Sequence, residues 1–217
     1  MNFRQSFKYL ALIALILGLF SCEGIFNGIY DDAVPAMSAE MGDDKVTVDA
    51  SDYEQWAYIN FHTMEVENVK ITLDEEGQPN FTEPEEWDIA IHRFQAKTNG
   101  GAAIETSYST IDEFLASGTL PTGEYSEDEW SDQTIIVDLS GMMSGNIKYC
   151  PSYVNNVLTS WISSSGMPPV YTTSDKVYVV RLKDNTFLAL RLESYMDNSG
   201  TKGYMTYSYA YPINFEK

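Results

Sequence analysis

The sequence predicts a mainly β protein with a minority of short helices, and three observations lead to this fold class. Apolar and polar residues alternate in several short runs, as they do in half-buried strands. Aromatic residues make up 13% of the chain, which is enough for a hydrophobic core. The chain also ends in three β-rich runs separated by turn residues. These runs predict antiparallel pairing in a C-terminal three-strand meander over 176–182, 186–195 and 203–212.

The first 21 residues have the pattern of a secretory signal. Two basic residues precede an apolar run over 10–20, which is too short for a comfortable transmembrane helix. The run leads into Leu-Phe-Ser-Cys at 19–22, which resembles the lipobox of bacterial lipoproteins, where cleavage precedes an acylated cysteine. We therefore predict a lipoprotein signal peptide over 1–21 and lipidation at Cys22. An ordinary signal peptide and an uncleaved anchor are the alternatives.

The chain is strongly acidic, with 32 Asp and Glu against 13 Lys and Arg and a net charge of −19. Cleavage after residue 21 removes Arg4 and Lys8 but no acidic residue, so the mature charge becomes −21. A nucleic-acid partner requires a basic footprint, which this composition excludes. If Cys22 carries lipid, Cys150 has no partner for an intramolecular disulfide, and we expect it to be an inert small hydrophobe. A metal thiolate or a nucleophile is the alternative for Cys150.

The folded domain is predicted over 51–217. Residues 22–50 are predicted to be the acylated cysteine followed by an acidic tether, because small and acidic residues dominate there and apolar periodicity is weak. The first strands are expected over 56–62, 66–73 and 85–94, where apolar residues recur at the strand period.

Two helices interrupt the predicted strands. The first is expected to begin at Thr110, because Thr110 and Glu113 form a capping box ahead of Phe114. A strand is expected over 133–139. The second helix is expected over 152–161, where one helical face would carry Val154, Val157, Leu158 and Trp161.

The sequence offers little support for an enzyme. His62 and His92 fall in predicted strands without a spaced cluster of further ligands, so a zinc site is not indicated, and His92 is expected to be structural. No nucleophile-elbow, phosphate-loop or dinucleotide motif occurs. Paired carboxylates could serve a hydrolase, but acidic runs in turns are usually solvated loops. These runs lie at 74–76, 83–86 and 126–130.

Three methionines lie in segments rich in turn-forming residues. Met142 and Met143 sit together in "LSGMMSGN", and Met167 lies in "SSSGMPP". Soluble proteins usually place methionine in the core, where its flexible thioether fills gaps. These methionines are therefore candidates for binding, and packing against the core is the alternative.

Three blocks of the sequence, at 87–102, 165–192 and 194–212, resemble the HmuY family of haem-binding lipoproteins, which are haemophores of the Gram-negative envelope. The resemblance covers roughly residues 51–217, and the lipoprotein signal agrees with it. It implies a mostly β domain whose loops, at one end, clasp one haem between two axial side chains.

The resemblance also implies which side chains bind the haem iron. The founding type uses two histidines, but this chain has no histidine after His92, and other members use methionine. The implied axial ligands are Met142 or Met143 from one loop and Met167 from the other. Thioether sulfur binds haem iron and favours the ferrous state. The implied pocket walls, which could equally be ordinary core residues, are Tyr149, Trp161 and Tyr171.

The implied function is that of a carrier and not of an enzyme. A lipid anchor at Cys22 would hold the protein at the outer membrane or cell surface. Release of the protein in soluble form is the other possibility. It would pass haem or porphyrin to a TonB-dependent outer-membrane haem receptor. Whether it forms a homo-oligomer stays open. One alternative is a non-catalytic surface lipoprotein for adhesion or glycan binding through exposed tyrosine and tryptophan. The other is a hydrolase that uses the acidic loops.

Overall fold

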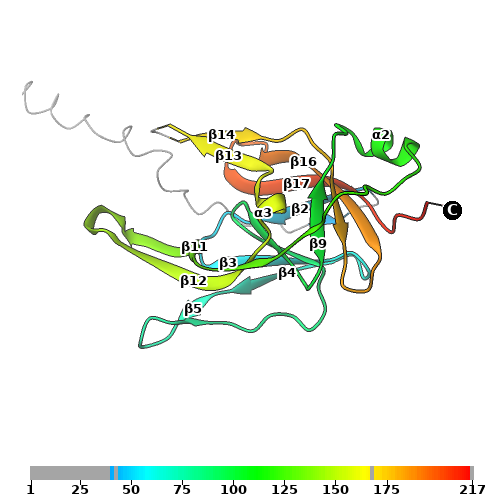
Figure 1. Cartoon of the computed structure of the whole chain (residues 1–217). Coiled ribbons are helices and arrows are strands. Elements are labelled where there is room, and N and C mark those ends of the chain that lie inside the picture. Colours follow the sequence, from blue (N-terminus) through cyan, green and yellow to red (C-terminus); the bar gives the residue numbers. More distant parts are fainter. Residues whose placement is uncertain (1–39, 42–43, 167–168, 216–217) are drawn as a thin grey trace, which may run out of the picture. The chain divides into compact units, whose positions relative to one another are not determined.

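The structure of the chain is a computed structural model that describes residues 40–41, 44–166 and 169–215 (Figure 1). The predicted signal peptide over 1–21 and the predicted lipidation site Cys22 lie outside the described residues. The described part is mainly β with antiparallel sheets, as the sequence predicts.

A seven-stranded antiparallel sheet forms the larger layer of the domain (Figure 1). The three C-terminal strands lie side by side in it, each paired with the next, so the predicted meander is confirmed. In spatial order the strands are β1 (Glu40–Met41), β2 (Lys45–Asp49), β17 (Lys202–Ala210), β16 (Phe187–Met196), β15 (Tyr178–Arg181), β9 (Ala102–Glu105) and β10 (Ser126–Glu127).

A four-stranded antiparallel sheet forms the second layer, and three strand pairs accompany the two sheets. The second sheet has the order β4 (Glu65–Lys70), β3 (Gln55–Asn60), β7 (Ile89–His92) and β8 (Gln95–Thr98). The pairs are β5 (Thr72–Leu73) with β6 (Pro79–Asn80), β11 (Glu129–Gly141) with β12 (Asn146–Val154), and β13 (Ile162–Ser165) with β14 (Val170–Thr173). Observed strands occupy each range predicted between residues 56 and 139.

Strand β3 shows why the layers stack as they do. Successive side chains of a strand point to opposite faces, and β3 carries large or apolar residues on both. Ala57 and Ile59 enter the core between the two sheets. Trp56 and Tyr58 point the other way and pack under the β11–β12 pair. Burial of such a side chain contributes roughly 1.5–3 kcal/mol, so β3 holds a layer against each of its faces.

The outer face of the larger sheet is covered by helix α2 (Ile111–Ala116) and the C-terminal segment, which pack Phe114 and Ile213 against it. Helix α2 begins as predicted, because the Thr110 hydroxyl accepts a hydrogen bond from the Glu113 backbone N–H at 3.1 Å. The Glu113 carboxylate accepts from the Ser109 backbone N–H at 3.3 Å, one residue before the position that the capping box predicts.

The folded domain begins earlier than residue 51. Val46 and Val48 are fully buried in β2, which pairs with β17 inside the larger sheet. The segment 45–49 therefore belongs to the fold, and its assignment to the tether is wrong. Two valines alternating with polar residues over five positions form a strand pattern too short to stand out in an acidic region.

The prediction of a helix over 152–161 is wrong for the first half of this range. Strand β12 continues to Val154, and only α3 (Asn156–Thr159) is helical. The strand ends where Asn155 caps α3, because its side-chain oxygen accepts a hydrogen bond from the Leu158 N–H at 3.0 Å. No helix within the described ranges is long and apolar enough to cross a membrane.

We predict that Asn155→Ala destabilises the protein by about 3 kcal/mol. Asn155 is fully buried, and its amide nitrogen donates to the Ser126 carbonyl at 3.0 Å and to Asp128 Oδ1 at 2.9 Å. Its loss removes the side-chain partner of the buried Leu158 N–H and of the Ser126 carbonyl, and one of the donors to Asp128. Urea unfolding followed by circular dichroism measures the change. The exposed neighbour is the control, and Asn156→Ala is expected to change stability by less than about 0.5 kcal/mol. Equal effects of the two substitutions would contradict the buried cap.

Candidate functional site

The first two candidate methionines lie at the tip of the β11–β12 hairpin. The single-turn 3-10 helix η1 (Met142–Ser144) forms this tip, and the Gly145 N–H donates to the Met142 carbonyl at 3.0 Å. Gly145 has φ +75°, a conformation that glycine adopts without strain. At Gly141 a side chain would clash, because an added Cβ would lie 2.2 Å from the Asn146 carbonyl oxygen. The glycines therefore allow the sharp turn that presents the methionines.

Both methionines at this tip are exposed. Met142 is 42% exposed and Met143 is 93% exposed, so neither fills a gap in the core. Burial of a methionine side chain would stabilise the fold by roughly 1.5–3 kcal/mol, and an exposed methionine does not make this contribution. The core-packing alternative therefore does not describe Met142 and Met143.

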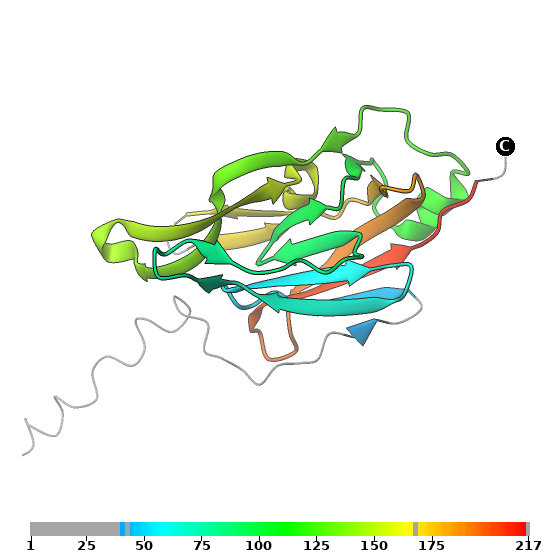
Figure 2. The same cartoon turned by 90° about the horizontal axis from the view of Figure 1, so that it is seen from below.

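The third candidate methionine lies in the sequence between the paired strands β13 and β14. Gly166, with φ +82°, follows the last residue of β13, and Met167 lies outside the described residues. Figures 1 and 2 show that the β11–β12 and β13–β14 hairpins project from the same end of the domain. The fold thus brings to one end two hairpins whose starting points are about thirty residues apart in the sequence.

Trp161 is a core residue, and its prediction as a pocket wall is wrong. Its side chain is fully buried, and its ring lies against those of Tyr207 and Tyr178 with centroid distances of 4.8 and 6.2 Å. The indole N–H donates to the Phe94 carbonyl at 2.8 Å. Since Trp161 packs inside the core between the sheets, it presents no face to a ligand at the hairpins.

The other two predicted walls are half-buried and lie on the hairpins. Tyr149 is on β12, paired with Ile136 of β11. Tyr171 is on β14, where its ring contacts Tyr195 with a centroid distance of 5.3 Å and Phe94 with one of 6.3 Å. Each is therefore partly exposed, and each lies on the strand that follows a segment with a candidate methionine.

Sequence reasoning missed Lys202 at this end of the domain. The Lys202 ammonium lies 5.0 Å from the centroid of the Tyr171 ring, a cation–π distance. Lys202 begins β17, and the contact arises because β14 packs near β16, the neighbour of β17. No local pattern in the sequence marks it, since the two residues are separated by thirty positions.

The two histidines are engaged elsewhere. His92 is 1% exposed, its Nε2 lies 2.8 Å from the Tyr53 carbonyl, and burial lowers its pKa to about 4. His62 Nε2 and Nδ1 lie 3.0 Å from Asp184 and 3.1 Å from Asp88. These contacts make both histidines structural and leave neither poised as a ligand at the hairpins.

Cys150 behaves as an inert thiol. It is 1% exposed in β12, and burial raises the pKa of its thiol, which keeps it protonated. Among the residues that the structure describes, no three His, Cys, Asp or Glu side chains gather as a metal site.

The comparisons with known proteins agree on one family. The model of the HmuY protein family matches residues 52–209. Among solved structures, a candidate lipoprotein of Bacteroides fragilis is 40% identical, covers 83% of this chain and 100% of its own, and has a TM-score of 0.75. A candidate HmuY-like haem-binding protein of Bacteroides vulgatus is 46% identical, with coverage of 78% and 92% and a TM-score of 0.72.

A more distant structure has the same fold. The apo form of an HmuY analogue from Tannerella forsythia is 27% identical, with coverage of 82% of this chain and 97% of its own and a TM-score of 0.64. No curated protein matches the chain.

We predict that His62 makes stability depend on pH. The hydrogen bond to Asp184, with a second to Asp88, raises the pKa of His62 above its usual value. A raised pKa stabilises the fold below the unfolded value of about 6.5, and this contribution is lost as pH rises through the folded value. His62→Gln should therefore cost up to about 1 kcal/mol at pH 6 and less at pH 9, since the group is partly exposed.

Urea unfolding at the two pH values measures the difference between wild type and His62→Gln. The only other histidine, His92, has a pKa of about 4 and stays neutral over this range, so it serves as an internal control. A cost of substitution that does not change between pH 6 and pH 9 would contradict the ion pairs of His62.

Proposed function

Because this chain belongs to the HmuY family, we propose that it binds one haem, or a related porphyrin, through axial methionine side chains at the two hairpin tips. The observation that carries the proposal is the exposed pair Met142 and Met143 on a glycine-bounded turn. The haem-binding name of the Bacteroides vulgatus neighbour supports the ligand class.

The chemistry of the donors fits haem. Haem supplies an iron that accepts axial ligands, and a methionine thioether is a soft donor that such iron binds. Met143 has more of its side chain free than Met142, but both reach solvent. Adjacent residues point in different directions, so we propose that one of the two coordinates and that Met167 of the second hairpin is the other ligand.

The surroundings of the hairpins suit a flat, dianionic macrocycle. Tyr149 and Tyr171 would supply the apolar walls. We propose that Lys202, beside the Tyr171 ring, would pair with a propionate, since an ammonium and a carboxylate attract. Lys202 would thereby orient the macrocycle, because its position next to Tyr171 is set by β17.

The proposed location and partner follow from the signal sequence. Lipidation at Cys22 would hold the protein at the outer membrane or cell surface, and the neighbour from Bacteroides fragilis, a candidate lipoprotein, supports this assignment. The protein would then pass its cargo to a TonB-dependent outer-membrane haem receptor. The mature charge of −21 would suit a basic patch on that receptor.

We predict that Met167→Ala weakens haem binding by about tenfold or more, because it removes an iron ligand. For the same reason we expect a loss of this size from either Met142→Ala or Met143→Ala, but not from both. Absorbance titration of the purified protein with haem measures the change through the Soret and Q bands. The control is Met64→Ala, because Met64 is similarly exposed, at 40%, but lies in the β3–β4 turn. Saturable binding that none of the three loop substitutions weakens would place the ligands elsewhere.

We also predict that reduction with dithionite tightens haem binding in the wild-type protein. A thioether stabilises ferrous iron relative to ferric iron, and this preference must appear as a difference in affinity. The measurement is the same titration in both oxidation states. Equal or tighter binding of ferric haem would contradict ligation by methionine.

A further inference from the structure

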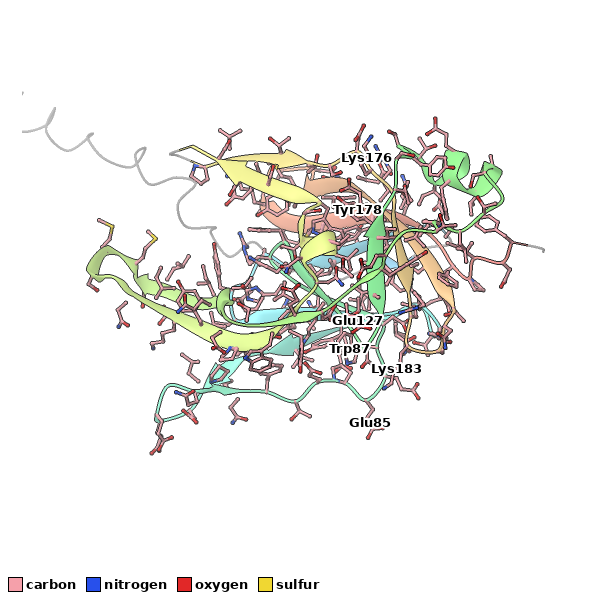
Figure 3. All side chains as sticks on the ribbon, in the orientation of Figure 1. Glu85, Trp87, Glu127, Lys176, Tyr178 and Lys183 are labelled. Carbon is pink, nitrogen blue, oxygen red and sulfur yellow. The ribbon has the colours of Figure 1, made fainter. Side chains whose placement is uncertain are left out.

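A cavity lies at the base of the β11–β12 hairpin, away from its tip. Its volume is about 430 Å³, within the range of small-molecule sites. The residues around it come from the segment after β6, from β8, from β10 and from the start of β11 and the end of β12. Figure 3 labels two of the lining residues, Trp87 and Glu127, which lie close together there. We call this cavity the Trp130 pocket.

The inner side of the Trp130 pocket holds a buried lysine inside an aromatic cage. The Lys97 side chain is 4% exposed, and its ammonium pairs with Glu83. The ammonium lies 4.2 Å from the Trp56 ring centroid and 5.3 Å from those of Tyr58 and Trp87. Such a cage could hold an organic cation, but the protein's own ammonium fills it. The cage is therefore not available to a ligand.

The charge of the lining disfavours anions as well. Three carboxylates line the pocket against one ammonium, so the formal balance is two negative charges. Asp128 is held in place, since it accepts from the Thr98 N–H at 2.7 Å and from the Asn155 amide at 2.9 Å. Glu127 is exposed and open to a ligand. Haem, with two propionates, would be repelled here.

The outer rim of the Trp130 pocket consists of two exposed aromatic rings. Trp130 is 58% exposed and Tyr153 is 55% exposed, and the two residues are paired across β11 and β12. Their rings meet edge to face with a centroid distance of 5.2 Å, and the Trp130 indole N–H donates to Asp132 at 2.9 Å. These contacts orient the tryptophan while much of its surface stays in water.

We propose that the Trp130 pocket binds a neutral saccharide. A sugar ring has apolar C–H faces that pack on an aromatic ring, and hydroxyls that bond to carboxylates and amides. Trp130 and Tyr153 supply the rings, and Glu127 supplies an acceptor. A neutral ligand does not need the filled cage, and the negative lining does not repel it. This saccharide site does not depend on haem binding at the hairpin tips. Glycan binding would be a second activity of the same domain.

The two sites can be tested separately. Trp130 pairs with Tyr153, and Gly141, which precedes Met142, pairs with Asn146. These two partners are seven positions apart on β12, which corresponds to roughly 20–25 Å. A sugar ring stacked on Trp130 therefore does not contact the hairpin tip.

Isothermal titration calorimetry of the purified protein tests the proposal, with maltotetraose, cellotetraose and chitotetraose as neutral probes and a heparin tetrasaccharide as the anionic probe. We expect saturable binding of at least one neutral probe at millimolar or tighter affinity. Trp130→Ala should weaken this binding by about tenfold or more, because stacking on the ring is lost. Glu127→Gln, a smaller change at an exposed residue, should also weaken it.

Met64→Ala is the control for saccharide binding, and Trp130→Ala should leave the haem titration unchanged. Unchanged circular dichroism checks that the variants remain folded. Three results would each overturn the proposal. The first is that no neutral probe gives a saturable binding isotherm up to about 10 mM. The second is that the heparin tetrasaccharide binds as tightly as the neutral probes or more tightly. The third is that Trp130→Ala leaves saccharide binding unchanged.

Discussion

The arrangement of this domain depends on strand β3, which is buried on both faces. Ile59 and Ala57 face the larger sheet, and Trp56 and Tyr58 face the opposite way. A strand with large apolar side chains on both faces must be covered twice, since each uncovered aromatic ring would leave a large apolar area in water. The larger sheet supplies one cover, and the β11–β12 hairpin supplies the other.

This second cover explains how a long hairpin can be anchored at one end and exposed at the other. Ile135, Val137 and Cys150 of the hairpin pack against the outer face of β3. Beyond them the strands leave the core, and the pair ends in the turn that carries Met142 and Met143. The base is held by burial while the tip is free to meet a ligand. The same anchoring places Trp130 and Tyr153 beside the cavity at the base.

Charge separates the two proposed sites. The Trp130 pocket keeps its one ammonium, Lys97, inside an aromatic cage, and three carboxylates line the cavity. At the hairpin end, Lys202 lies over Tyr171, where it stays within reach of an anionic group. In a chain with so few cations, the placement of single lysines decides which ligands each site tolerates, because neighbouring carboxylates repel anions where no ammonium offsets them.

The sequence by itself determined the features that depend on neighbouring residues. These are the mainly β class, the C-terminal meander, the capped start of α2, the family resemblance and the position of Met142 and Met143 in a turn. The resemblance rests on three blocks of sequence, and the other features follow from strand alternation, a capping box or a cluster of turn residues.

Only the tertiary structure decided which faces are covered. It joined Val46 and Val48 to the larger sheet, continued β12 through Val154 in place of a helix, and buried Trp161 in the core. It also placed Lys97 inside an aromatic cage built from two separate segments, strand β3 and the segment between β6 and β7. A local pattern shows that a residue is apolar or charged. Its burial and partners are set by segments distant in the sequence, because pairing between strands and packing between layers are long-range interactions.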